Sequence, residues 1–188
     1  MLFRSRVLPD YDLVIVADYG HGFLTRRAAT ALAEKAPFLA VNTQTNSANL
    51  GYNLVTKYPR ADYVCIDEPE IRLAMHDRWS PVPDLAQKVR GLLATRAVSV
   101  TRGHQGALTC DQDGGQWTVP VFSHEVVDRV GAGDAYLAVT APCVAAGWPM
   151  EVVGFVGNAV GALAVRIVGN RFPVEPVPLY KFITALLT

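Results

Sequence analysis

The sequence predicts an α/β fold in which a mostly parallel sheet is covered by helices on both faces. Short β-rich runs alternate along the chain with longer helical segments, as in sheets built from β-α-β units. Hydrophobic residues make up 51% of the 188 residues and charged residues only 18%, which suits strands buried on both faces. Polar or glycine-containing turns follow several of the predicted strands, and ligands of open α/β sheets bind at that carboxyl edge.

We expect one domain over residues 1–188, long enough to bury a substantial core. The glycine turn Asp111–Gly115 predicts an antiparallel hairpin at one edge of the sheet. In chain order, the predicted elements are strand Asp12–Ala17, helix Thr25–Lys35, strand Phe38–Val41, strand Asp62–Ile66, helices Glu68–His76 and Asp84–Thr95, strands Ala97–Thr101, Ala107–Cys110, Trp117–Val121 and Glu125–Val127, and helices Ala132–Ala146, Glu151–Val168 and Pro178–Leu187.

The segment Glu151–Val168 is apolar enough to suggest a membrane span. Its glycines resemble a stripe of small residues along which helices pack. Asn158 and Arg166 interrupt the segment, however, and a span needs about 20 apolar residues. We therefore predict a buried helix that packs closely on its neighbour, and no membrane partner.

Charge and cysteine content exclude several classes of protein. Lys and Arg number 17, as do Asp and Glu, and without a basic patch we expect no nucleic-acid partner. Cys65, Cys110 and Cys143 are far apart, so they form no metal motif and suit a reducing compartment. The start, Met1–Asp10, carries two arginines without a following apolar core, so we expect a cytoplasmic protein.

The turn Gly131–Asp134 is the most informative part of the chain. Val126 and Val127 are interpreted as the end of a buried strand, and a helix is predicted to begin at Ala132. The first amides of a helix lack internal partners and attract anions such as phosphate. An Asp at the same place could take a proton from a hydroxyl that attacks a phosphoryl group. The alternative is an Asp that only caps the helix of an unrelated α/β protein.

The run Asp128–Asp134, with the sequence Asp-Arg-Val-Gly-Ala-Gly-Asp, resembles the second signature of the ribokinase-like (PfkB) carbohydrate kinases. The family pattern is Asp-Thr-Thr-Gly-Ala-Gly-Asp. Arg129 and Val130 replace the two threonines, which leaves open the substrate and any dependence on a monovalent cation. The resemblance extends from Tyr11 to about Val174. It implies that Asp134 is the catalytic base and that an anion hole is formed by the amides of Gly131, Ala132 and Gly133.

A second turn follows the predicted strand Ala97–Thr101. Two glycines three residues apart can fold backbone amides around a phosphate. The resembling family has a Thr-x-Gly-x-x-Gly turn here that holds the nucleotide phosphates, which implies that role for Thr101, Gly103 and Gly106. From the residues alone, an ordinary glycine hairpin is the favoured interpretation.

Two carboxylates open the helix after the strand Asp62–Ile66. Asp67 and Glu70 would share one face at the helix start, with Pro69 in its first turn. They could hold Mg²⁺, directly or through water, against phosphates. The family pattern here is Asn-x-x-Glu, so Glu70 matches and Asp67 replaces the Asn. A capping box with solvated charges is the alternative.

Two loops could reach a substrate. Asp18, Tyr19 and Gly22 match an Asp-Tyr-x-x-Gly turn of the heptose-phosphate kinase branch of the family, with His21 where that branch usually has Lys. His21 could touch the transferred phosphate or be a solvated loop histidine. The polar loop that begins at Asn42 could form a sugar or nucleotide edge, but it also has the composition of any surface loop.

The resemblance implies an ATP-dependent phosphotransferase that uses ATP with Mg²⁺ and acts on a sugar or sugar-phosphate hydroxyl. In relatives the adenine lies against the segment that contains Asn158, Ala159 and Gly161. The chain corresponds to the C-terminal, nucleotide-binding portion of such a kinase, and the N-terminal sugar-binding and lid portion is expected to be missing. A complementing N-terminal portion or a homo-oligomer could meet the exposed edge of the first strand. Whether the chain is active alone is left open, and a non-catalytic ATP-binding or assembly module is the alternative.

Overall fold

The computed structural model describes residues 7–123 and 125–188, and its centre is a six-stranded sheet with the order β1-β2-β3-β4-β5-β6. Strands β1 to β4 pair in parallel, and β5 is antiparallel to both of its neighbours. The predicted mostly parallel sheet with an antiparallel hairpin is therefore confirmed. The strands are β1 Val14–Asp18, β2 Leu39–Thr43, β3 Tyr63–Asp67, β4 Ala97–Thr101, β5 Ala107–Cys110 and β6 Gln116–Val119.

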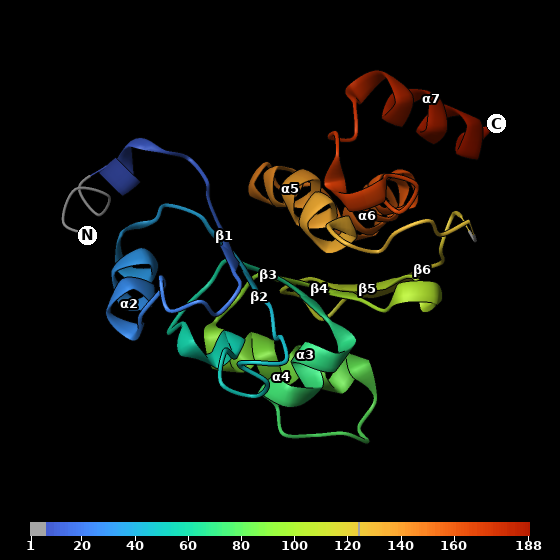
Figure 1. Ribbon diagram of the computed structural model, residues 1–188. Coiled ribbons are helices and arrows are strands. Elements are labelled where there is room, and N and C mark those ends of the chain that lie inside the picture. Colours follow the sequence, from blue (N-terminus) through green and yellow to red (C-terminus); the bar gives the residue numbers. More distant parts are fainter. Residues whose placement is uncertain (1–6, 124) are drawn as a thin grey trace.

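Helices cover both faces of this sheet, as predicted. Figure 1 shows α5 and α6 on one face, α2, α3 and α4 on the other, and α7 outside α6. The helices are α2 Arg26–Lys35, α3 Glu68–Ala74, α4 Val82–Leu93, α5 Ala132–Ala145, α6 Met150–Ala164 and α7 Pro176–Leu187. The described residues also form short 3₁₀ turns in the connecting segments, η1 Leu8–Asp10, η2 Val55–Lys57, η3 Gly103–Gln105 and η4 Val168–Asn170. Of the predicted start Met1–Asp10, residues 1–6 lie outside the described residues.

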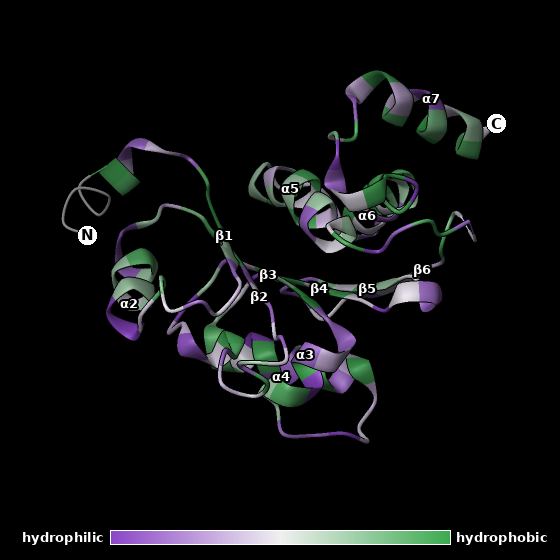
Figure 2. Ribbon diagram, in the orientation of Figure 1, coloured by the Kyte–Doolittle hydropathy of each residue, from purple (hydrophilic) through white to green (hydrophobic). Residues whose placement is uncertain are grey.

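The core is divided by the sheet into two main clusters. In Figure 2, hydrophobic residues concentrate on the strands and on the helices that flank them. Valine, leucine and isoleucine side chains predominate between the sheet and α3 and α4, whereas alanine and tyrosine make up a larger share of the cluster on the α5 and α6 face. A smaller cluster, which includes Ala159, lies between α6 and α7. All five residues of β2 are buried, as expected for a parallel strand covered on both faces.

The predicted buried helix is α6, which ends at Ala164 rather than at Val168. Its glycines allow close approach to its neighbours. A Cβ at Gly154 would lie 2.9 Å from Val119 Cγ2, and one at Gly157 would lie 2.3 Å from the Tyr136 ring on α5. Within the described parts of the chain, no helix is both long and apolar enough to cross a membrane.

The predicted strand Glu125–Val127 is wrong. Val126 and Val127 are exposed and belong to no strand. The backbone N–H groups of Val127 and Asp128 instead donate to the Val165 carbonyl at the end of α6, both at 2.9 Å. Two β-branched valines favour an extended backbone, but a strand also needs a neighbouring strand, and this segment runs along a helix end.

Candidate active site

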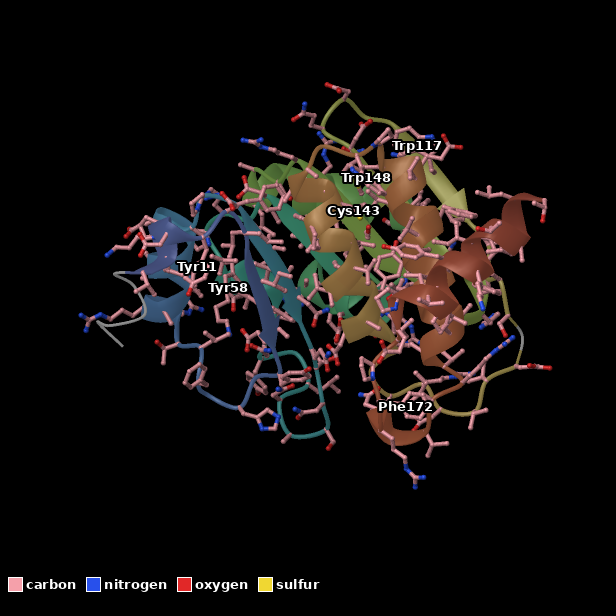
Figure 3. All side chains as sticks on the ribbon, turned by 90° about the horizontal axis from the view of Figure 1, so that it is seen from above. Tyr11, Tyr58, Trp117, Cys143, Trp148 and Phe172 are labelled. Carbon is pink, nitrogen blue, oxygen red and sulfur yellow. The ribbon has the colours of Figure 1, made fainter. Side chains whose placement is uncertain are left out.

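The carboxyl ends of β1 to β4 and the amino end of α5 lie at one end of the molecule. In Figure 3, Phe172 lies at the same end as the loops that follow β1 and β2, and Trp117 and Trp148 lie at the opposite end. Two side-chain contacts tie these segments together. The Gln44 amide joins the loop after β2 to Asp134 on α5, and Arg102 after β4 bonds to Glu68 on α3.

Asp134 lies in the first turn of α5, and its side chain contacts the loop that follows β2 at the carboxyl edge of the sheet. Gly131 is the residue before the helix, with a φ of +80° that favours glycine. Gly131 has no side chain that could cap α5, and Asp134 lies within the first turn of the helix rather than at the N-cap position. Asp134 Oδ1 instead accepts a hydrogen bond from Gln44 Nε2 at 2.9 Å.

The turn before Asp134 has its backbone partly open. A Cβ at Gly133 would meet nothing within 4 Å, so a ligand could approach the backbone there. The Ala132 N–H, however, donates to the Arg129 carbonyl at 3.3 Å. One of the three amides expected to form the anion hole is therefore already bonded within its own loop. Asn170 of η4 lies against Gly131, where an added Cβ would be 2.1 Å from its side chain.

Tyr19 and Gln44 lie in the two loops that were expected to reach a substrate, but neither was predicted as a site residue. Burial raises the pKa of the Tyr19 phenol above its usual value, and the charge of the Asp134 carboxylate and a hydrogen bond to it raise it further. Both residues directly follow the carboxyl end of a strand, Tyr19 after β1 and Gln44 after β2. That position was the signal that could have identified them.

Asp18 lies in the interior, with only 3% of its surface exposed. Its Oδ2 pairs with the Lys57 ammonium group and accepts the Tyr58 hydroxyl at 2.8 Å. Its Oδ1 accepts the Gly20 N–H at 3.1 Å. These contacts hold the loop after β1 against η2, because a buried carboxylate needs paired and hydrogen-bonded partners. Contact between Asp18 and a substrate stays a prediction.

His21 and Asn42 differ in their surroundings. His21 is exposed and lies edge-on to the Tyr19 ring, with ring centroids 6.5 Å apart. Asn42 is buried, and its Nδ2 donates to the Cys65 carbonyl at 2.8 Å. This bond bridges β2 and β3 beyond the last backbone pair of their ladder. Asn42 Oδ1 has no hydrogen-bond partner among the residues that the structure describes.

Asp67 and Glu70 form the capping box that was the alternative to a metal site. Asp67 Oδ1 accepts the Glu70 N–H at 2.7 Å, and Glu70 Oε2 accepts the Asp67 N–H at 3.2 Å. Glu70 does more than cap, because its Oε1 accepts the Thr45 N–H from the loop after β2 at 3.0 Å. The carboxylate therefore ties the start of α3 to that loop.

The electrostatics of this pair suit a cation. Burial, and then the negative charge of Asp67, raise the pKa of Glu70 to about 7. A divalent cation would relieve the repulsion that raises this pKa. Both carboxylates accept hydrogen bonds from backbone N–H groups, and an ionised carboxylate has further oxygen lone pairs that could bind Mg²⁺ or its water ligands. In the described part of the chain, no group of three or more His, Cys, Asp and Glu could surround a metal, so such an ion would depend on further oxygens from a phosphate or water.

The turn with Thr101, Gly103 and Gly106 connects β4 to β5 through η3. The Gly106 N–H donates to the Gly103 carbonyl at 3.0 Å. A Cβ at Gly106 would lie 2.0 Å from the Val119 carbonyl oxygen, so glycine is required there by the neighbouring strand. Gly103 has a φ of +54° and open space around it. A phosphate contact stays a prediction for this turn, with Gly103 the residue best placed for it.

Asn158, Ala159 and Gly161 do not share one environment. Asn158 is buried, and its Nδ2 donates to the carbonyls of Val119 and Pro120, both at 2.8 Å. Ala159 is fully buried. A Cβ added at Gly161 would meet no atom within 4 Å, so Gly161 is the one of the three around which space is open. Their contact with adenine stays a prediction.

The comparison with protein families decides what kind of protein this is. The model of the pfkB family carbohydrate kinases matches residues 22–176. The chain belongs to this family. The resemblance inferred from the Asp128–Asp134 run is thereby confirmed.

Among curated pfkB relatives, a D-beta-D-heptose 7-phosphate kinase of Bordetella bronchiseptica is 30% identical over 88% of this chain and 52% of its own length. A 2-dehydro-3-deoxygalactonokinase of Haloferax volcanii is 33% identical over 63% of this chain and 37% of its own. The expected likeness to the heptose-phosphate kinase branch is therefore confirmed. The chain spans about half the length of these relatives or less.

The fold is ribokinase-like, as predicted. The structure of Arabidopsis thaliana ribokinase complexed with ribose and ATP superposes with a TM-score of 0.76 and 16% identity, over 96% of this chain and 58% of that chain. At this identity the likeness concerns the fold alone.

Proposed function

We propose that this chain is the phosphoryl-transfer portion of an ATP-dependent carbohydrate kinase that acts on a hydroxyl of a sugar or sugar phosphate. The observation that carries this proposal is the placement of Asp134. Its carboxylate is not used to cap α5 and reaches the carboxyl edge of the sheet. The family to which the chain belongs supports the same chemistry.

In this reaction the acceptor hydroxyl oxygen would bond to the γ-phosphorus while the bond from that phosphorus to the bridging oxygen breaks and ADP leaves. Asp134 would take the hydroxyl proton as general base. The backbone N–H groups of Gly131, Ala132 and Gly133 would stabilise the charge on the transferring group. The Ala132 N–H would first have to leave the Arg129 carbonyl.

ATP is the proposed donor, and the solved ribokinase relative contains ATP in its structure. Thr101, Gly103 and Gly106 would hold its phosphates, and the open side of α6 at Gly161 would face the adenine. Asp67 and Glu70 would hold Mg²⁺, directly or through water. The ion would supply positive charge that neutralises the phosphates.

The acceptor is proposed to enter beside the loop after β1. Residues 17–24 line a hollow of about 360 Å³ that includes Tyr19 and His21. A larger hollow of about 480 Å³ lies between α3 and α4, away from Asp134. Because the chain covers only part of its relatives, an N-terminal portion or a second copy is proposed to complete the sugar site. The three cysteines are free, which supports a cytoplasmic location.

A non-catalytic ATP-binding or assembly module is the second candidate. It is favoured by β1, which stands at the end of the sheet and pairs with β2. Ile15 on this strand is 42% exposed. An edge strand of this kind is a site for association with another chain.

The deciding experiment measures binding and transfer on the same samples. Calorimetry with ATP and Mg²⁺ should show binding to the wild type that is nearly unchanged in Asp134→Asn, because the base acts on the acceptor in the transition state. Transfer from radiolabelled ATP to sugars and sugar phosphates should be lost in Asp134→Asn. Asp113→Asn, on the exposed β5–β6 turn, is the matched control. Binding without transfer in the wild type would favour the assembly module, and no ATP binding would exclude both.

A further inference from the structure

The Asp134 carboxylate is held by a loop that comes from the other end of the chain. Gln44 Nε2 donates to Asp134 Oδ1 at 2.9 Å, across 90 positions of sequence. The neighbouring loop after β1 carries Tyr19, and burial and then the Asp134 charge raise the pKa of its phenol. Both loops were expected to reach a substrate, but no contact with Asp134 was predicted for either residue.

Both loops are fixed to each other by buried hydrogen bonds. The Gln44 N–H donates to the Asp18 carbonyl at 2.8 Å. Asn53 Nδ2 donates to the same Asp18 carbonyl at 2.8 Å and to the Gln44 carbonyl at 3.1 Å. Lys57 Nζ donates to Asn53 Oδ1 at 2.8 Å. Both the backbone N–H and the backbone carbonyl of Gln44 are therefore hydrogen-bonded, and these bonds fix the position from which its side chain extends.

The loop after β1 is held in the same way. The Tyr19 carbonyl accepts the side-chain amides of Asn46 and Asn49, at 3.3 Å and 3.1 Å. A Cβ at Gly20 would lie 2.0 Å from Asn49 Nδ2, so the two loops are in close contact at that point. Tyr19 and Gln44 thus belong to one interlocked unit, defined here as residues 18–20 and 44–57.

We infer that Gln44 is a positioning residue that orients the Asp134 carboxylate toward the acceptor hydroxyl, with the loop of Tyr19 as part of its support. This inference rests on the proposed function, since it needs Asp134 to be the base. Gln44 occupies Oδ1 as a donor, which leaves Oδ2 for the hydroxyl proton. Small displacements of a reacting group are costly, and an error of about 1 Å can lower a rate about 100-fold.

The first test measures the contact itself and needs no activity. In the ¹⁵N NMR spectrum, the Gln44 side-chain amide signal, assigned with Gln44→Leu, should shift in Asp134→Asn and remain in place in Asp113→Asn. The same Asp134→Asn change should lower the pKa of Tyr19 toward its usual value, because a nearby negative charge is removed. A Gln44 signal that does not respond to Asp134→Asn would overturn the inference.

The second test measures transfer of radiolabelled phosphate by the full chain, at saturating ATP and an excess of acceptor. Gln44→Glu keeps the size of the side chain and removes the donor, so it should lower the rate by about 10- to 100-fold with the KM for ATP within about twofold. Tyr19→Phe should lower it less, because Asp134 keeps its bond to Gln44. Gln112→Glu and Tyr180→Phe, both on exposed residues outside this unit, are the matched controls and should have the wild-type rate.

The outcomes separate this inference from the proposed function. If Asp134→Asn abolishes transfer and Gln44→Glu leaves the rate unchanged, the positioning role is refuted and the proposed base stands. If Asp134→Asn transfers as well as the wild type, the proposed base is refuted. If the wild type transfers no phosphate, alone or with an added N-terminal kinase portion, while the Gln44 signal still responds to Asp134, the contact is a structural tie and the positioning role is refuted with the proposed function.

Discussion

The two faces of the sheet are held by different kinds of interaction. On the face of α3 and α4, the core consists of branched aliphatic side chains such as Val64, Ile66, Leu85 and Val89, all almost fully buried. On the face of α5, buried hydroxyls are part of the contact. The Tyr63 hydroxyl bonds to Ser99 Oγ at 2.8 Å and to Thr140 Oγ1 on α5 at 2.9 Å.

The difference bears on how the helix that carries Asp134 is placed on the sheet. Apolar burial is strong but non-directional, so it stabilises the sheet without fixing the rotation of a helix on it. Hydrogen bonds are directional. Close contacts at small residues are sensitive to small displacements of the helices. The face that carries Asp134 is held by hydrogen bonds and close contacts. We therefore expect substitutions on this face to disturb the geometry of the site more than they lower the free energy of unfolding.

The largest effect on stability is expected on the aliphatic face. Leu85→Ala removes a fully buried side chain of α4 and should lower the free energy of unfolding by about 2–5 kcal/mol. ATP affinity measured below the unfolding transition should not change, because α4 lies on the far side of the sheet from α5. The control is Leu92→Ala on the same helix, where the side chain is 63% exposed and the change should stay within about 0.5 kcal/mol. Equal losses in the two variants would contradict the assignment of this core.

The second effect depends on pH and lies where α3 meets the candidate site. The pKa of Glu70 is raised from 4.5 to about 7 in the folded chain, so folding favours its protonated form. The stability that Glu70 contributes is present below about pH 4.5 and is lost as the pH rises through about 7. At about 1.4 kcal/mol for each pKa unit, the loss is on the order of 3–4 kcal/mol.

Urea unfolding at pH 5 and pH 8, in wild type and Glu70→Gln, measures this effect in the presence of a chelator. The stability difference between wild type and variant should move in favour of the variant as the pH rises. Mg²⁺ added at pH 8 should stabilise the wild type more than Glu70→Gln if the carboxylate pair holds the ion. A pH profile that is parallel in the two proteins would show that Glu70 does not titrate in this range.

The smallest effect on stability is expected between α5 and α6. Gly157→Ala places a Cβ 2.3 Å from the Tyr136 ring and 2.9 Å from Thr140 Cγ2, so the helices must move apart at a cost of about 1–3 kcal/mol. Gly161→Ala on the same helix meets open space and should be neutral or stabilising by up to about 1 kcal/mol. Because α5 carries Asp134, phosphoryl transfer at a temperature where Gly157→Ala is fully folded should fall as well. Retained transfer would show that the site tolerates a shift of α5.

Much of the fold could be predicted from local sequence. Strands β1 to β6 were each predicted within about three residues of their observed bounds, because β-rich runs bounded by turn residues are local signals. The exception is Glu125–Val127, where the valines have the right propensity and no strand to pair with. The capping box at Asp67 and Glu70 was also visible in sequence, since both members lie within four residues.

Local sequence was thus enough to predict the alternation of strands and helices, the glycine turn before α5, the place of Asp134 in its first turn and the family. Three features came from the folded structure: Gln44 reaches Asp134, Lys57 and Tyr58 bind the carboxylate of Asp18, and Ala159 is buried while Gly161 is open. These features could not be predicted because the partners are far apart along the chain. Local pattern sets the backbone of each segment, whereas the partner of a side chain 40 to 90 positions away depends on how packed loops meet at the edge of the sheet.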